Sequence, residues 1–380
     1  MRITAPTETA PGETRVALVP RSATQLVSTG ATVAIQAGAG MAAGITDAAY
    51  SEVSAEVVPD RKTLLADADI VVVVRRPDVT FVSGLKRGAI LVGVLEPAGD
   101  PALVRALVDG GITAFRLEAM PRISRAQDMD VLSSMATLAG YHAAVMAAFR
   151  LPRIFPLMMT AAGTITPARA LILGAGVAGL QAIATCRRLG AVVEAFDVRP
   201  AVRDQVESLG ARFVETGVES ETQQDTGGYA RELEADAQAR QRQVLAEHVK
   251  ESDVVITTAL IPNRKAPVLV TADMVASMRT GSVLVDLAAP GGGNCELTRP
   301  DEEVNANGVL ILGPTNLPAS IPGQASQLYS HNATRFLMQL LKDGQVHLDF
   351  DDVVISQTCI THEGKAMGEQ IEALLQGATA

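Results

Sequence analysis

The chain has 380 residues, which is enough for two domains of ordinary size. Hydrophobic residues make up 48% and charged residues 19%, which excludes an intrinsically disordered chain, and the formal net charge of -10 argues against nucleic acid or an anionic membrane surface as the main partner. Aromatic residues make up only 3%, so alanine, valine, leucine and glycine must fill the core, as they do in parallel α/β sheets.

The cysteines and the apolar stretches indicate the cellular compartment of the chain. Cys186, Cys295 and Cys359 have no CxxC spacing, so we expect neither a disulfide framework nor a metal site. The N-terminus, MRITAP, has a strand pattern rather than a leader. The longest apolar stretches, such as residues 70–74 and 141–149, are shorter than the roughly 18 residues of a membrane span. We therefore expect a cytoplasmic chain that does not insert into a membrane itself.

Short β-branched runs alternate with helical patterns along the first third of the chain. Strands are predicted at residues 31–36, 69–74, 89–94 and 112–118. A helix is predicted at 101–108, because its leading proline suits a first helical turn. This alternation is typical of βαβ units that form a parallel sheet.

The same alternation begins again near residue 169. Strands are predicted at residues 170–173, 192–196, 212–214, 253–258, 282–287 and 309–312. Six strands in this arrangement indicate a doubly wound nucleotide-binding domain. After Pro314 the pattern predicts a loop, a helix at 325–341 and a short β tail that returns to the first domain.

The predicted fold class is therefore α/β, with two Rossmann-like doubly wound parallel-sheet domains and a cleft between them. The first domain is expected to be discontinuous, with residues 1–133 and 322–380. The second, with residues 134–321, is expected to carry the nucleotide.

A glycine motif follows the first strand of the second domain. It consists of Gly174, Ala175, Gly176, Val177, Ala178 and Gly179, and a helical pattern follows it. The first glycine permits a tight turn, the second lets backbone N–H groups approach a pyrophosphate, and the third allows close packing of helix and strand. The phosphates are expected at the positive end of the helix. The sequence therefore predicts a dinucleotide site.

The end of the next strand bears on the choice between NAD and NADP. Asp197 ends the strand about 20 residues after the motif, where a carboxylate can accept hydrogen bonds from ribose hydroxyls. It would also repel a 2′-phosphate, so NAD(H) is favoured. Arg199, which follows Val198, complicates this prediction because a nearby arginine can accommodate a 2′-phosphate, although its side chain could equally point into solvent.

Two polar segments interrupt the alternation. Residues 122–134, RISRAQDMDVLSS, lie between the two halves, and residues 215–229, ETGVESETQQDTGGY, precede a charged helix predicted at 230–250. Long loops inside compact domains are usually functional or disordered. The alternative for the first segment is a polar linker whose serine and aspartate cap a helix.

An obvious acid or base for proton transfer is missing. A dehydrogenase that acts on an alcohol or amine moves a proton as well as a hydride, and it most often uses histidine or lysine. We expect no histidine at a strand end where a cleft would form, and the sequence contains no GxSxG motif or P-loop. The five histidines are at positions 142, 248, 331, 347 and 362. The pattern favours chemistry that moves only a hydride.

Four stretches together resemble a known family. They are MPRISRAQDMDVLSSMATLAGY, MMTAAGTITPARALILGAGVAGLQAIAT, TGGYA and TTALIPNRKAPVLVTADMV. The chain is similar to the NAD(H)-binding domain I of the Re/Si-specific, proton-translocating nicotinamide nucleotide transhydrogenase. The resemblance extends from PGETRVAL near residue 11 to the SQTCIT tail, and its most specific mark is RISRAQDMD.

The resemblance implies partners and a location. Domain I of that family dimerises and passes a hydride from NADH to NADP⁺ that is held on a separate domain III, on a beta subunit. A membrane domain II couples this transfer to proton translocation. The chain resembles the first piece of a split alpha subunit, so it would lie at the cytoplasmic membrane through its partner subunits, and it would not itself bind NADP(H).

The resemblance also implies roles for individual residues. Arg122, Asp130 and Ser133 would contact the carboxamide side of the nicotinamide, and Gln127 would reach toward the nucleotide of the partner domain. The motif residues 174–179, with Asp197, Val198 and Arg199, would bind the rest of NAD(H). Tyr229 would belong to a mobile loop that closes over the nucleotide. Ring-to-ring hydride transfer needs proximity and orientation rather than acid–base work, which agrees with this set.

Two alternatives remain. Alanine dehydrogenase shares the pattern PGETRVAL with Arg15, which holds the substrate carboxylate in that family. This sequence has Arg75 where that family has its lysine and Glu96 where it has its histidine, so the catalytic set is broken and Arg15 is expected to hold a turn or a carboxylate. The other alternative is a non-enzymatic NAD-binding module, which leaves RISRAQDMD without a role.

Overall fold

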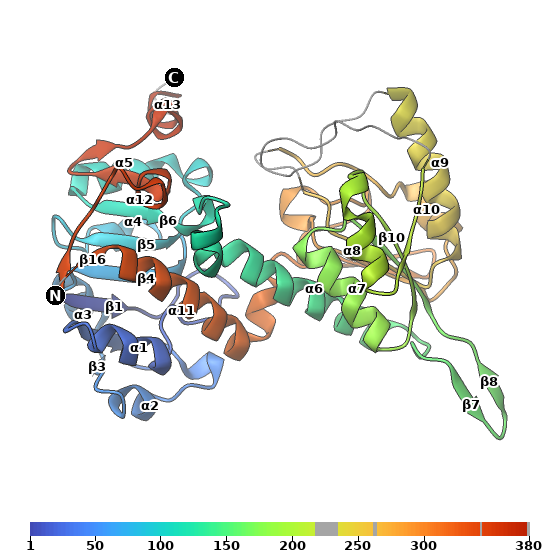
Figure 1. Cartoon of the computed structure of the whole chain (residues 1–380), viewed down its shortest axis with the longest axis horizontal. Coiled ribbons are helices and arrows are strands. Elements are labelled where there is room, and N and C mark those ends of the chain that lie inside the picture. Colours follow the sequence, from blue (N-terminus) through green and yellow to red (C-terminus); the bar gives the residue numbers. More distant parts are fainter. Residues whose placement is uncertain (217–234, 261–263, 343, 378–380) are drawn as a thin grey trace. The chain divides into compact units, whose positions relative to one another are not determined.

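The computed structural model describes residues 1–216, 235–260, 264–342 and 344–377. Contacts divide the chain into two compact units, one of Met1–Met135 with Pro318–Ala380 and one of Ala136–Leu317. The boundary falls within helix α6 (Val131–Arg150). Each unit has its own β-sheet with helices around it, so the predicted α/β class is confirmed (Figure 1).

Unit 1 contains a sheet whose described strands have the order β19-β18-β6-β5-β4-β1-β2-β3. The strands are β1 (Arg2–Ala5), β2 (Thr32–Gln36), β3 (Glu56–Val58), β4 (Ile70–Arg75), β5 (Ile90–Val94), β6 (Thr113–Arg116), β18 (Cys359–His362) and β19 (Lys365–Ala366). The helices are α1 (Pro20–Val27), α2 (Asp47–Ser51), α3 (Arg61–Ala66), α4 (Val79–Val82), α5 (Pro101–Gly110), α11 (Pro322–Gln339), α12 (Val353–Thr358) and α13 (Glu369–Gly377). A small hairpin of β16 (Leu341–Lys342) and β17 (Gln345–Val346) follows α11.

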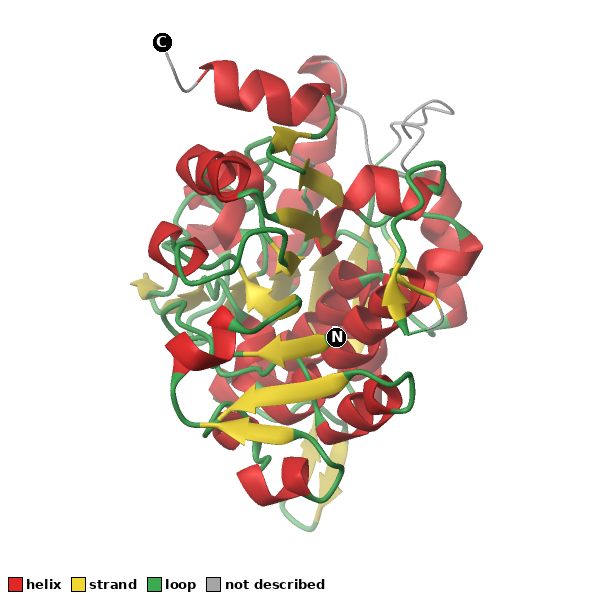
Figure 2. Cartoon of the chain, turned by 90° about the vertical axis from the view of Figure 1, so that its left-hand side faces the viewer, coloured by secondary structure: helices red, strands yellow, loops and turns green. Residues whose placement is uncertain are grey.

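The sheet of unit 1 is buried on both faces. Val72 and Val74 of β4 pack into a core with α1 and α11, while Val71 and Val73 pack into a second core with α4 and α5. Successive side chains of a strand point to opposite faces, so a strand with helices on both sides needs a continuous apolar run. Figure 2 shows the strands in yellow with helices on both sides.

The C-terminal tail differs from the sequence prediction. The pattern predicts only a short β tail after α11, but the tail also contains the helices α12 and α13. Its strand β18 pairs antiparallel with β6 and extends the sheet of unit 1. The tail therefore adds a strand to the sheet of unit 1, together with two helices that the pattern does not predict.

Unit 2 contains a doubly wound sheet with the strand order β11-β10-β9-β12-β13-β15-β14. The strands are β9 (Arg169–Leu173), β10 (Val192–Phe196), β11 (Arg212–Phe213), β12 (Val254–Thr257), β13 (Val283–Asp286), β14 (Glu303–Ala306) and β15 (Val309–Leu312). The helices are α7 (Val177–Arg188), α8 (Arg203–Ser208), α9 (Ala235–Glu251) and α10 (Ala272–Ser277). Only β14 is antiparallel to its neighbour in this described sheet. The order reverses beside β9, and ligands of such sheets bind at that point, beyond the carboxyl ends of the strands.

Two β elements of unit 2 were not predicted. The edge strand β14 is one, and a hairpin of β7 (Met158–Thr160) and β8 (Gly163–Ile165) is the other. The strands of this hairpin pair only with each other in the described residues. Their residues are exposed, so the hairpin extends away from the core of the unit.

Helix α6 corrects the expectation about apolar length. With 20 residues and a mean hydropathy of 1.3 over its most apolar window, it is the one described helix long and apolar enough to cross a bilayer. Length and composition alone are weak evidence, because core helices meet the same criterion. Ala143, Ala144 and Ala147 of α6 are buried in the core of unit 2. Gly140 lies so close to α7 that a Cβ atom there would be 2.0 Å from the carbonyl oxygen of Ala178.

Candidate functional site

The glycine motif forms the turn between β9 and α7. Gly174 has a φ of +103°, a conformation that favours glycine. A Cβ atom on Gly179 would lie 1.8 Å from the carbonyl oxygen of Gly174, and one on Gly174 would lie 2.6 Å from Oγ1 of Thr258. The first and third glycines are therefore required by the packing of the turn itself.

Gly176 is different, because none of the described residues fills the space beside it. A Cβ atom there would have no atom of the described residues within 4 Å, and φ of -77° is open to any residue. Gly176 is also the N-cap of α7 and provides no side-chain hydrogen bond to the first turn. The first N–H groups of a helix need acceptors, and an anion is a suitable one. The open space at this helix end fits the phosphates of a dinucleotide.

Asp197 connects the end of β10 to this turn. Its Oδ2 atom accepts a hydrogen bond of 2.7 Å from the backbone N–H of Ala175. Its carboxylate also accepts hydrogen bonds of 2.9 Å from Nε, Nη2 and the backbone N–H of Arg199. The arginine side chain therefore folds back onto the carboxylate rather than pointing away into solvent. Val198, between the two, is partly buried in the core with α9 and α10.

The residues that pack against the glycine turn from the loops after β12 and β13 were not identified from the sequence. Thr258 follows β12, and its hydroxyl donates to the carbonyl oxygen of Gly174 at 3.0 Å. Asn294 accepts from the N–H of Ala259 at 2.9 Å and donates to the carbonyl oxygen of the same residue at 2.8 Å. The fully buried Asp286, at the end of β13, accepts from the N–H of Asn294 at 2.8 Å. A buried carboxylate therefore organises the loop that follows β12.

The RISRAQDMD segment lies in unit 1 and forms the 3₁₀-helix η4 (Ser124–Met129). A 3₁₀-helix has three residues per turn, so positions three apart share a face. Ala126 and Met129 share the face that is buried in the core of unit 1. Ser124 and Gln127 share another, and both are exposed.

The third face of η4 is bound to the C-terminal part of the chain. Asp128 Oδ2 accepts a hydrogen bond of 2.6 Å from Nε of Arg335, and its carbonyl oxygen accepts one of 2.8 Å from Nδ2 of Asn332. Arg125 binds Asp352, with 3.1 Å between Nη1 and Oδ2. Arg125 and Asp128 alternate along the segment with Arg122, Gln127 and Asp130, to which the resemblance gives roles at the nicotinamide.

Asp130 and Ser133 bind each other at the start of α6. The carboxylate accepts hydrogen bonds of 2.9 Å from the N–H and 2.6 Å from the hydroxyl of Ser133. This is the geometry of a helix N-cap. The capping alternative from the sequence therefore describes these two side chains in the structure. Arg122 is exposed just before η4.

The predicted site residues fall into two groups. The glycine motif, Asp197 and Arg199 come together in unit 2, and Arg122, Gln127, Asp130 and Ser133 lie along one segment of unit 1. Tyr229 lies outside the described residues, as does its loop apart from residues 215 and 216.

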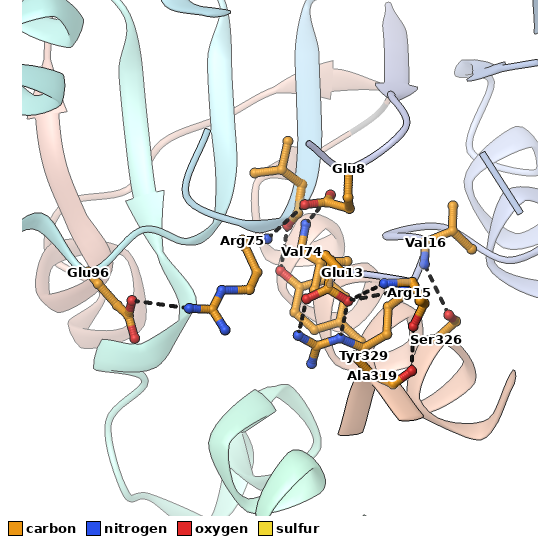
Figure 3. A network of polar contacts seen from close by, with 12 residues as sticks. Glu8, Glu13, Arg15, Val16, Val74, Arg75, Glu96, Ala319, Ser326 and Tyr329 are labelled. Atoms are coloured by element: carbon orange, nitrogen blue, oxygen red, sulfur yellow. Dashed lines mark hydrogen bonds and ion pairs between the residues drawn. The ribbon is translucent and has the colours of Figure 1, made fainter. Parts of the chain in front are cut away.

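The residues of the alanine dehydrogenase alternative lie in a polar network of unit 1 (Figure 3). Arg15 is only 6% exposed, and its Nε and Nη2 atoms donate to Glu13 at 2.7 and 2.6 Å. The expectation that Arg15 holds a carboxylate of its own domain is confirmed. Arg75 lies 3.9 Å from Glu96 and forms an ion pair with it.

Glu8 is the carboxyl group of this network whose pKa departs most from its ordinary value. Its oxygens accept hydrogen bonds of 2.7 and 3.1 Å from the N–H groups of Val74 and Arg75 at the end of β4 (Figure 3). Burial raises the pKa of Glu8 to about 7, although these two hydrogen bonds oppose the shift. Its carboxyl group thus lies between β1 and β4, where the strand order of this sheet reverses.

One histidine, His362, ends a strand, β18. Because β18 is antiparallel to β6, its end meets Thr113 at the start of β6, with 3.1 Å between Nδ1 and Oγ1. His362 therefore lies at the edge opposite the carboxyl ends of the parallel strands.

An open cavity of about 320 Å³ lies at the amino edge of the unit 2 sheet. Arg153 and Arg279 line it and bind Asp253 at 2.9 and 3.4 Å, and Asp253 also accepts from the N–H of Arg169. One carboxylate therefore holds both arginine side chains at this cavity. In the described residues, no three His, Cys, Asp or Glu side chains gather as metal ligands, and the three cysteines are buried and free.

Two family models cover most of the chain. The "Alanine dehydrogenase/PNT, N-terminal domain" matches residues 4–139, and the "Alanine dehydrogenase/PNT, C-terminal domain" matches residues 143–369.

Curated relatives favour one branch of this family. The chain is 47% identical over 370 residues to "NAD(P) transhydrogenase subunit alpha" of Cereibacter sphaeroides, covering 96% of this chain and 70% of that one. It is 44% identical over 372 residues to the first piece of the divided NAD(P) transhydrogenase subunit alpha of Rhodospirillum rubrum, covering 96% and 97%. The alanine dehydrogenase of Mycobacterium tuberculosis is 31% identical over 381 residues, covering 98% and 96%.

Solved structures show the same order of likeness. A transhydrogenase from Sinorhizobium meliloti has a TM-score of 0.84 and 40% identity, covering 97% of this chain and 100% of that one. An L-alanine dehydrogenase has a TM-score of 0.82 and 27% identity, covering 99% of both chains. Similarity in fold barely separates the two branches, whereas sequence identity does.

Proposed function

Because this chain belongs to the NAD(P) transhydrogenase alpha-subunit family, a branch of the alanine dehydrogenase/transhydrogenase group, we propose that it is the NAD(H)-binding component of a proton-translocating transhydrogenase. In this proposal NADH bound to unit 2 passes a hydride directly to NADP⁺ on a domain III of a beta subunit. The single observation that carries NAD(H) binding is the open space beside Gly176 at the start of α7. The packing of the turn accounts for Gly174 and Gly179 but not for this glycine.

Each group of the turn has a defined task in binding. The first N–H groups of α7 donate to the pyrophosphate, and the positive end of the helix favours its charge. Asp197 accepts from the ribose hydroxyls. A carboxylate has about four lone-pair sites, and four donors from Ala175 and Arg199 already occupy them. The ribose must therefore share or displace a hydrogen bond of Arg199.

The residues of unit 1 would orient the nicotinamide. When bound, the cofactor supplies the hydride from C4 of its nicotinamide ring. Arg122, Asp130 and Ser133 would hold the carboxamide, and Asp130 and Ser133 already lie within hydrogen-bond distance of each other. Gln127 is exposed, which suits a residue that reaches toward the partner's nucleotide. The Tyr229 loop would close over the nucleotide, and it lies outside the described residues.

No proton acceptor is needed for this reaction, which distinguishes it from the alanine dehydrogenase alternative. There, Arg15 would have to hold a substrate carboxylate, but it is buried against Glu13. Arg75 is not interchangeable with the lysine of that family, and it forms an ion pair with Glu96. We therefore propose no alanine dehydrogenase activity. Single-turnover transfer of a hydride from bound NADH to a protein-bound NADP⁺ tests the function, and the absence of transfer would contradict it.

Exposed apolar side chains of unit 2 bear on the oligomeric state of the chain. Phe149 at the end of α6 is 86% exposed, and the β7–β8 hairpin exposes Met159, Met158 and Ile165. Exposed apolar side chains of this size are typical of interaction surfaces. We propose a homodimer, attached peripherally to the cytoplasmic membrane through domain II and the beta subunit. Light scattering of the purified chain at several concentrations tests the dimer, and a monomer at micromolar concentration would contradict it.

A further inference from the structure

The orientation of Gln127 depends on how η4 is held. Burial of Ala126 and Met129 keeps the helix against the core of unit 1, but apolar contacts have no preferred direction. A short 3₁₀-helix has poor internal hydrogen-bond geometry, and η4 has no side-chain cap at its start. Its rotation must therefore be set by contacts from outside.

Such contacts come from α11, which lies against η4. Arg335 donates to the side chain of Asp128 at 2.6 Å, and Asn332 donates to its backbone carbonyl at 2.8 Å. Hydrogen bonds are directional, so two of them at one residue fix the angle of the face next to Gln127.

Asn332 supports this interpretation by its surroundings. It is buried, with 4% of its surface exposed, and its Oδ1 atom has no hydrogen-bond partner among the described residues. A buried acceptor without a partner costs stability, so this amide is poorly suited to packing alone. Its one described side-chain hydrogen bond is the one to Asp128.

A further anchor lies on the same face of η4. Arg125, three positions before Asp128, binds the carboxylate of Asp352. Asp352 is itself held at the start of α12, where it accepts from the N–H of Val354 at 2.8 Å. Both residues of this face are thus bound to the C-terminal part of the chain, and the face with Gln127 is left exposed.

We propose that Arg335 is a positioning residue for hydride transfer, because it fixes η4 through Asp128 and thereby sets the direction of Gln127. The inference rests on the proposed function and adds to it the residues of α11. It predicts that loosening the ion pair affects the alignment of the two nicotinamide rings and leaves NADH affinity unchanged.

The test uses Arg335→Gln, Asp128→Asn and the double variant in the full chain. The matched control is Lys86→Gln, which removes another exposed ion pair of unit 1. The side chains of Lys86 and Asp69 are 41% and 37% exposed, against 47% and 40% for Arg335 and Asp128. Lys86 precedes β5, and its partner Asp69 precedes β4.

Transfer from saturating NADH to NADP⁺ on a partner domain III is measured in a single turnover, together with NADH affinity and the thermal midpoint. Each single variant is expected to slow transfer about ten-fold, since small misplacements of reacting groups have effects of this order or larger. The double variant should be no slower than either single one, because both act through one contact. Additive losses, equal loss in Lys86→Gln, or a parallel loss of NADH affinity would overturn the proposal.

Amide hydrogen exchange of residues 122–130 measures how firmly η4 is held, and it does not require domain III. Faster exchange in Arg335→Gln than in Lys86→Gln is expected, and equal exchange would overturn the proposal. If the unaltered chain transfers no hydride, the proposed function fails, and this exchange measurement still decides whether Arg335 holds η4.

Discussion

Asp197 accepts a hydrogen bond of 2.7 Å from the backbone N–H of Ala175, so the end of β10 is fastened to the glycine turn that follows β9. The same carboxylate is bound by Arg199 through three hydrogen bonds. One side chain thus shapes the turn and neutralises the nearest arginine.

This arrangement predicts the behaviour of Asp197→Ala. The loss of a charged acceptor should weaken NADH binding by about 2 kcal/mol, or roughly 30-fold. Arg199 loses its carboxylate and becomes able to bind a 2′-phosphate, so NADPH should bind more tightly than it does to the unaltered chain. Fluorescence titration with both nucleotides measures these changes.

The double variant Asp197→Ala with Arg199→Ala should lose the gain for NADPH. Asp273→Ala, at an exposed aspartate of α10, is the control. Unchanged affinity of Asp197→Ala for both nucleotides would remove Asp197 from the site.

The glycines of the motif should respond in opposite ways. Gly179→Ala places a Cβ atom 1.8 Å from the carbonyl oxygen of Gly174, so it should destabilise the fold by about 1–3 kcal/mol. Gly176→Ala meets no atom of the described residues within 4 Å, so its thermal midpoint should fall much less than that of Gly179→Ala while NADH affinity falls. Thermal unfolding and NADH titration of both variants measure the contrast. Full NADH affinity in Gly176→Ala would mean that the open space holds no phosphate.

Gln127→Asn should separate binding from transfer. The side chain is exposed, and shortening it by one methylene removes its reach without disturbing the buried face of η4. NADH affinity should stay the same, whereas transfer to NADP⁺ should slow by about 100-fold, because orientation is the main source of rate in this reaction. Parallel measurements of NADH binding and single-turnover rate check this. Weaker binding with fast transfer from bound NADH would refute the assigned role.

Glu8 should make the stability of unit 1 depend on pH. Its folded-state pKa of about 7 lies above the ordinary value of 4.5, because burial disfavours the charged form. The neutral group therefore stabilises the fold fully below pH 4.5, and this contribution is lost as the pH rises through 7. The change amounts to about 3 kcal/mol.

Urea unfolding at pH 5 and pH 8 measures this dependence. Glu8→Gln cannot ionise, so it should lose less stability between the two pH values than the unaltered chain. Glu52→Gln, at an exposed position of unit 1, should lose as much as the unaltered chain. An equal pH dependence in Glu8→Gln would show that Glu8 does not titrate in this range.

Local sequence patterns were sufficient to predict much of the fold. Strands such as β10 and β15 are mostly buried apolar runs, and the structure gives them the predicted bounds. The β7–β8 hairpin was missed because its two strands have three residues each and pack against no core. Strand β14 was missed because half of its residues are exposed at the sheet edge. Short or edge strands leave little periodic signal.

The glycine motif could be predicted because its parts are adjacent in sequence. The residues that hold η4 and the glycine turn in place could not be predicted, because their hydrogen-bond partners are far away in the sequence. Asp128 and Arg335 are separated by 207 positions, and Thr257 and Asp286 by 29. Asp286 gives no local signal of its role, since a buried aspartate is recognised only from the donors that the fold brings to it.

The most direct test of the account is single-turnover oxidation of an NADH analogue with a distinct absorbance spectrum by the purified chain. One reaction contains an NADP⁺-loaded domain III, and the other contains pyruvate with ammonium. Rapid oxidation is expected in the first reaction only. Oxidation with pyruvate and ammonium would contradict it, because Arg75 and Glu96 would then perform chemistry that their ion pair argues against, and no oxidation in either reaction would leave only a nucleotide-binding module.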